Sequence, residues 1–110
     1  MKRITIDLDK IRDKESFHDV FAETFGFLEG YGRNMDAWID CMTNLDEPLA
    51  GLSKITCEKG DYFVLELNNI KQFHKRCPNL FDDIIECSAF VNWRRLERGN
   101  LPLLMLSFYS

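Results

Sequence analysis

Apolar residues mark three extended segments along the chain. Residues 2–8 alternate between the two faces of a strand, and one face is formed by Ile4, Ile6 and Leu8. This period of two predicts a strand that buries a single face. Residues 62–67 and 101–108 are almost continuously apolar instead. Such runs are typical of interior strands that are covered on both faces.

Helical spacing of apolar residues fills the segments between these strands. Ser16 is a predicted N-cap, and Gly26 a predicted end, of a helix whose core stripe is Phe17, Val20, Phe21 and Phe25. Residues 70–76 predict a short helix that Pro78 stops, and residues 79–98 predict the longest helix of the chain. The apolar face of this last helix comprises Leu80, Phe81, Ile84, Ile85, Ala89, Phe90, Val91 and Leu96.

The order of these elements predicts an α/β fold. Strands alternate with helices, which favours a small parallel sheet in a domain of this size. Residues 52–57 are also β-like, and Gly60 favours a turn between them and residues 62–67, so the sheet is expected to carry an added β-hairpin. With 110 residues, the chain is expected to form a single domain, residues 1–110.

The stretch from Gly30 to Cys41 combines a glycine-bracketed loop with the start of a helix that Asn34 can cap. One side of this helix is apolar and comprises Met35, Trp38, Ile39, Met42 and Leu45, whereas Asp36, Asp40, Thr43 and Asn44 fall on the opposite side, which faces solvent. Asp36 and Asp40 are four residues apart, and like charges at this spacing destabilise an isolated helix by about 0.2–0.5 kcal/mol. Because stability does not require the pair, we interpret it as functional.

Charge and composition narrow the possible partners. The formal net charge of −4 argues against direct nucleic-acid binding and favours a basic protein partner. No apolar run is long enough to span a membrane, and no signal peptide is recognisable, so a cytoplasmic location is expected. The four cysteines lack a C-x-x-C pair and are expected to be reduced and mostly buried: Cys41, Cys57, Cys77 and Cys87.

Enzymatic sites receive little support from the sequence. The Gly30-Tyr31-Gly32 stretch lacks the third glycine of a dinucleotide-binding loop. His18, which is expected on the surface, has no nucleophile beside it, and His74 lies in an unrelated segment. Two hypotheses remain for Asp36 and Asp40: a Mg²⁺ or catalytic site, and an acidic patch that binds the basic cleft of a protein. The second is favoured, and no cofactor is expected.

Residues Tyr31–Thr43 resemble the barstar family, small intracellular inhibitors of ribonucleases. The stretch Tyr31-Gly32-Arg33-Asn34-Met35-Asp36-Ala37-Trp38-Ile39-Asp40-Cys41-Met42-Thr43 follows a pattern like Y-G-x-N-[LM]-D-A-x-x-D-C-[LM]-T. The resemblance implies a three-stranded parallel sheet with packed helices and no catalysis. It also implies that the loop and the second helix plug a ribonuclease active site. There, the aspartate matching Asp40 replaces a substrate phosphate, while those matching Asp36 and Asn34 contact the rim.

The predicted partner-binding residues are Tyr31, Gly32, Asn34, Asp36, Ile39, Asp40 and Thr43 within the segment Gly30–Thr43. Gly30, Arg33 and Ile39 differ from the family's best-known member, so they are where a different partner would be selected. The last helix ends in Arg94, Arg95 and Arg98, which complement its dipole, whereas that member has acidic contacts nearby. The alternative hypothesis is an interaction domain of the same fold whose partner is not a nuclease.

Overall fold

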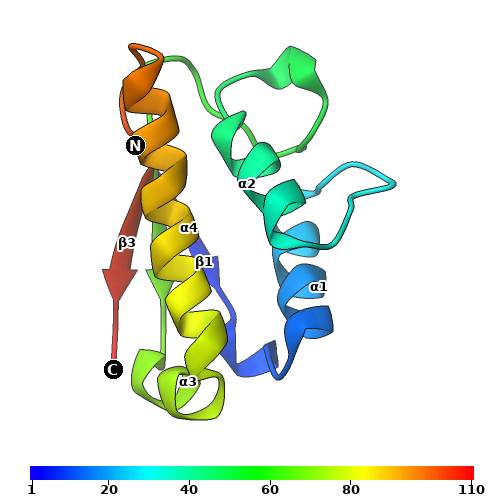
Figure 1. Ribbon diagram of the computed structural model, residues 1–110, viewed down its shortest axis with the longest axis vertical. Helices are drawn as coiled ribbons and strands as arrows, with labels where there is room; N and C mark the ends of the chain where they lie inside the picture. The colour runs from blue at the N-terminus through cyan, green and yellow to red at the C-terminus, as the bar shows by residue number, and fades with distance from the viewer.

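A computed structural model describes residues 1–110 (Figure 1). The chain folds into a three-stranded parallel sheet with four α-helices. The strands are β1 (Lys2–Ile6), β2 (Phe63–Leu67) and β3 (Leu104–Phe108), in the order β1-β2-β3. The helices are α1 (Lys14–Phe25), α2 (Met35–Thr43), α3 (Ile70–Arg76) and α4 (Pro78–Glu97), with 3-10 turns at Leu8–Lys10 and Pro48–Ala50. The predicted α/β fold with a small parallel sheet is therefore confirmed.

The predicted β-hairpin is wrong. Strand β2 is the central strand and pairs with β1 on one side and β3 on the other, both in parallel, so neither of its edges is free for residues 52–57. The backbone of that segment bonds instead to the ends of the first two helices. Lys54 and Ile55 donate to the carbonyl of Phe25, and Cys57 donates to that of Leu45.

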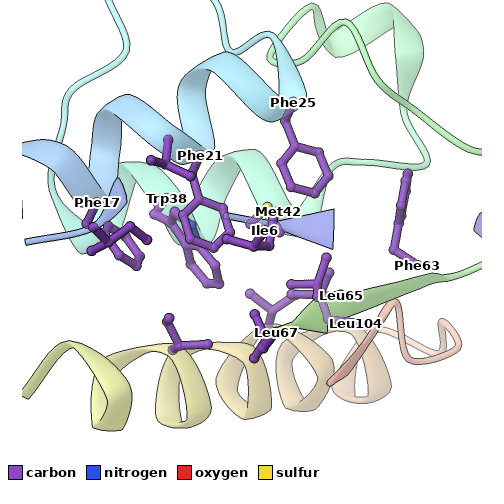
Figure 2. Packing of buried hydrophobic residues seen from close by; sticks show 14 of the residues in the cluster. Ile6, Phe17, Phe21, Phe25, Trp38, Met42, Phe63, Leu65, Leu67 and Leu104 are labelled. Atoms are coloured by element: carbon purple, nitrogen blue, oxygen red, sulfur yellow. The ribbon is translucent and has the colours of Figure 1, made fainter. Parts of the chain in front are cut away.

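The core lies between the sheet and the helices. Figure 2 shows three phenylalanines of α1 stacked along this layer, next to Trp38 and Met42 of α2 and facing the leucines of β2. The following core residues are fully buried, with 0% of their surface exposed: Phe17, Phe21, Phe25, Trp38, Met42, Leu65 and Leu67. The prediction that Trp38 belongs to the core is confirmed.

Only one face of the sheet is covered. The inward positions of β2 are fully buried, whereas Arg3 and Thr5 of β1 and Met105 of β3 are exposed on the other face. The expectation that the last strand is covered on both faces is therefore wrong. Its apolar run is longer than its buried part, and Phe108 is also exposed.

Helix α1 begins earlier than the sequence pattern predicts. Asp13 is the N-cap, and its side chain accepts a hydrogen bond from the backbone N–H of Ser16 at 2.8 Å. Ser16 returns the contact by accepting from the N–H of Asp13, which makes a reciprocal capping box. Gly26 ends the helix in the left-handed conformation, with φ of 65°, as predicted.

Helix α4 buries a narrower stripe than predicted. The buried positions recur every three or four residues and are Leu80, Ile84, Ser88, Val91 and Arg95. Phe90 and Leu96, which the apolar pattern places in the core, are exposed. The helix packs against α2, α3 and β3, and its outer side stays in solvent. No helix in the structure combines the length and apolar character needed to cross a bilayer.

Candidate functional site

The loop before α2 projects from the helical layer between α1 and α2 (Figure 1). Gly30 and Arg33 both have positive φ, 86° and 54°, which turns the chain sharply into the helix. Asn34 then caps α2 by accepting a hydrogen bond from the backbone N–H of Ala37 at 2.8 Å. The predicted N-cap is confirmed, and it fixes where the exposed face of α2 begins.

Two side-chain contacts hold this loop against α1. The hydroxyl of Tyr31 is 2.6 Å from Nδ1 of His18. The guanidinium of Arg33 donates to Asp19 at 2.7 Å and to the carbonyl of Glu15 at 3.0 Å. The positive φ of Arg33, which is unusual for a residue other than glycine, is therefore accompanied by contacts that define the conformation of the loop.

The expected surface position of His18 is wrong, because only 5% of the residue is exposed. Its spacing of three residues before Phe21 and seven before Phe25 is the signal that places it beside the buried stripe. Burial lowers the pKa of His18, and the positive charge of Arg33 lowers it further. Burial also raises the pKa of Tyr31, so neutral rings face each other across this hydrogen bond.

Helix α2 presents its two carboxylates to solvent as predicted. Asp36 is exposed, and 66% of the Asp40 side chain is accessible. Trp38 and Met42, on the opposite side, are fully buried. The helix is thus anchored by large apolar side chains, and the carboxylate of Asp40 is carried on a rigid support.

Two other predicted site residues lie underneath this surface. Ile39 is 9% exposed and Thr43 is 4% exposed, so the prediction that Thr43 faces solvent is wrong. The hydroxyl of Thr43 donates to the carbonyl of Ile39 at 2.6 Å. Helix α2 is covered on its flank by α4 as well as on its inner side, so its buried stripe is wider than the apolar pattern indicates. Of the loop residues, Gly32 is exposed and Tyr31 is half-buried.

An arginine of the neighbouring helix lies beside Asp40. Helices α2 and α4 run next to each other (Figure 1), and Nη1 of Arg94 is 3.6 Å from Oδ1 of Asp40. The guanidinium also lies over the ring of Phe90, 5.7 Å from its centroid. Near the start of α2 the surroundings are acidic instead: burial raises the pKa of Cys87, and the nearby acids Asp83, Glu86 and Asp36 raise it further. The exposed face of α2 is therefore surrounded by acids at its start and meets a cation at Asp40.

A second arginine of α4 ties the end of α2 to the core. Arg95 and Asp46 are each 5% exposed, and two parallel hydrogen bonds of 3.0 and 2.8 Å join them. Arg95 also donates to the carbonyls of Thr43 at 3.1 Å and Leu101 at 2.8 Å. The sequence analysis assigned Arg95 only a role in complementing the helix dipole and did not predict this buried ion pair. Its spacing of four residues from buried Val91 was the available signal.

The carboxylates of α2 lie outside the hollows of the surface. None of the hollows in the structure is lined by Asp36 or Asp40, and the largest, of about 530 Å³, lies by the Glu47–Lys59 ion pair instead. No group of three or more His, Cys, Asp or Glu side chains is arranged to hold a metal ion. Small-molecule sites are concave, whereas a protruding carboxylate is suited to enter a cleft of another protein.

Comparison with known proteins agrees with this architecture. No curated protein matches the chain at a significant level. A family model described as Barstar (barnase inhibitor) matches residues 1–104, which is nearly the whole chain. The match takes in every strand and helix up to the start of β3, together with the loop and helix that carry Asp36 and Asp40. The chain therefore belongs to the barstar family, whose members are protein inhibitors of ribonucleases.

Proposed function

We propose that this protein inhibits a ribonuclease or ribonuclease-like toxin by covering its active site with the acidic loop-helix Gly30–Thr43. The supporting observation is the exposed carboxylate of Asp40 on a helix that is anchored in the core. A ribonuclease site is built to bind the phosphates of RNA with cationic side chains. A carboxylate held in a fixed position supplies the same negative charge and accepts hydrogen bonds from those groups.

Within this proposal we give the predicted site residues two roles, according to their exposure. Asn34, Asp36 and Asp40 are exposed and are the proposed contacts, with Asp40 in the phosphate position and the other two at the rim of the cleft. Gly32 and Tyr31 shape the loop beside them. Ile39 and Thr43, which are buried, support the helix from beneath, so we assign them no direct contact with the partner.

We propose no catalytic role for the chain. An exposed pair of aspartates that lines none of the hollows in the structure lacks the enclosed arrangement of acid, base and substrate that catalysis uses. The acids act instead as binding groups. On this proposal, inhibition is stoichiometric: one protein molecule blocks one ribonuclease molecule and leaves it chemically unchanged.

The proposal is tested by titrating the purified protein into a panel of small basic ribonucleases and following RNA cleavage and heat of binding. At least one ribonuclease should lose activity at a molar ratio near one. Replacing Asp40 by Asn preserves the shape of the side chain and removes its charge. This change should weaken binding by roughly 10- to 100-fold, because a hydrogen bond to a charged group contributes about 1.5–3 kcal/mol.

A matched control separates the role of Asp40 from that of net charge. Asp82 is an exposed acid on α4, and Asp82→Asn removes the same unit of charge outside the proposed site. This variant should bind like the wild type. Equal binding by Asp40→Asn and the wild type would exclude the phosphate-mimic role. Inhibition of none of the ribonucleases, together with capture of a partner of another class, would favour an interaction domain of this fold.

A further inference from the structure

Asp40 has a positively charged neighbour within its own chain. The contact between Nη1 of Arg94 and Oδ1 of Asp40 spans 3.6 Å, which is an ion-pair distance but too long for a good hydrogen bond. The lone pairs of the carboxylate are therefore not occupied by Arg94. Only 27% of the Arg94 side chain is accessible, compared with 66% for Asp40, so the carboxylate is the more open of the two partners.

The position of Arg94 is defined by its own helix. Phe90 precedes it by four residues, and residues at this spacing are neighbours on a helix surface. The guanidinium lies over the Phe90 ring at 5.7 Å, a cation–π contact. Because Arg94 rests between this ring and α2, its charge is held next to Asp40 even when no partner is bound.

We infer that Arg94 is an internal counter-ion of Asp40 that competes with the cation of a bound partner. Only a partner whose contact with Asp40 is stronger than that of Arg94 then binds tightly. This inference rests on the proposed function, in which Asp40 binds a cationic group of a ribonuclease. A flexible lysine on a generally basic surface gains little by replacing one ionic contact with another. A rigidly placed arginine forms two parallel hydrogen bonds with a carboxylate, which the 3.6 Å contact does not provide.

The kind of partner follows from this competition. The favoured protein presents a fixed guanidinium opposite Asp40 and has no further cation facing Arg94, because like charges placed against each other disfavour association. Broadly basic proteins are discriminated against, since Arg94 repels their additional cations beside Asp40. Arg94 is thus a specificity-determining residue that acts through Asp40.

The experiment uses the ribonuclease that the wild-type protein binds most tightly, at 150 mM salt. Replacing Arg94 by Gln should tighten binding about two- to fivefold, which corresponds to the strength of an exposed ion pair. Lys71→Gln is the matched control, because Lys71 is an exposed cation on α3, away from Asp40, and its removal changes the net charge equally. This control should leave the dissociation constant unchanged within twofold.

A double variant shows whether the effect passes through Asp40. In the Asp40→Asn background, Arg94→Gln should not tighten binding, because the carboxylate for which Arg94 and the partner's cation compete is absent. The inference is overturned if Arg94→Gln weakens binding, which would mean that Arg94 itself contacts the partner. It is also overturned if the gain is the same with and without the Asp40 carboxylate.

A titration with hexaarginine peptide keeps the test independent of the proposed ribonuclease. Chemical shifts of the Asp40 and Asp36 amides report binding, and hexalysine is the comparison peptide. Arg94→Gln should lower the dissociation constant for hexaarginine about two- to fivefold relative to the wild type. A gain here without binding to any ribonuclease would support the counter-ion role while the proposed function fails. No gain with either probe would overturn the counter-ion role.

Discussion

Asp46 and Arg95 form the most buried ion pair in the molecule, with side-chain exposures of 5% and 6%. Such a pair gives little net stability compared with apolar residues of the same size, because both charges lose their hydration. Removing only one partner is much more costly. The remaining guanidinium stays buried among the carbonyls of Thr43 and Leu101 without its counter-charge.

We therefore expect Asp46→Asn to lower the free energy of unfolding by about 3–5 kcal/mol, measured by urea denaturation at pH 7. Glu47→Gln, which breaks the exposed Glu47–Lys59 pair, should leave stability almost unchanged. Replacing both buried partners, as Asp46→Leu with Arg95→Met, should recover part of the loss because no charge is left unpaired. Similar losses from Asp46→Asn and Glu47→Gln would contradict this account.

The loop that precedes α2 depends on α1 for its conformation. Tyr31 contacts His18, and Arg33 contacts Asp19, so both anchoring residues of the loop use the same helix. The pKa of His18 is lowered in the folded protein by burial and by Arg33, below its ordinary value of 6.5. Proton uptake by His18 is thus less favourable in the folded state than in the unfolded state.

This difference makes stability depend on pH in a defined direction. Well above pH 6.5, His18 is neutral in both the folded and the unfolded state, so it makes stability no more or less dependent on pH. As the pH falls below 6.5 towards the lower folded pKa, the unfolded chain binds the proton first and stability declines. Urea denaturation at pH 7.5 and 5.5 should show a larger loss for the wild type than for His18→Gln. Equal losses in the two proteins would exclude His18 as the responsible group.

The elements that the sequence predicted well are those with a strong local signal. The alternation in β1, the phenylalanine stripe of α1, the Gly26 end and the Asn34 cap are all decided by neighbouring residues. Residues 52–57 have a β-like composition but no free strand edge to join, so tertiary pairing overrides their propensity. No local pattern could reveal that β1 takes the place beside β2.

The candidate site shows the same division. The exposed Asp36 and Asp40 follow from helical periodicity, and the family resemblance supplies their proposed role. The neighbourhood of these residues depends on packing between helices, which periodicity does not describe. For that reason the position of Arg94 beside Asp40 and the burial of Thr43 emerged only from the structure.

At the scale of the whole molecule, the reactivity of the four thiols depends on how tightly the chain is packed around them. Cys41, Cys57 and Cys77 are buried, Cys87 is half-buried, and all four are free, which confirms the predicted burial of most thiols. Burial, together with the nearby charge of Asp40, raises the pKa of Cys41 to about 11. The thiolate is the reactive form, so both burial and high pKa slow its modification.

We expect a disulfide reagent such as Ellman's reagent at pH 8 to modify one thiol of the native protein, Cys87, well before the other three. All four should react rapidly in 6 M guanidinium chloride. Cys87→Ser should abolish the early phase of the reaction. In denaturant, this variant should have one reactive thiol fewer than the wild type. An early phase that persists in Cys87→Ser would show that the core opens more readily than its packing indicates.

The parallel sheet joins segments that are far apart in the chain. Lys2 lies opposite Phe63, and Phe63 opposite Leu104, so the ladders connect residues separated by roughly 60 and 40 positions. Contacts of this range form late, because the entropy of closing long loops opposes them, and such topologies fold more slowly than helical bundles. Trp38, which anchors α2, packs in the core that these strands complete. A newly made chain therefore acquires its rigid proposed binding surface only when the slowest, most distant pairings have closed.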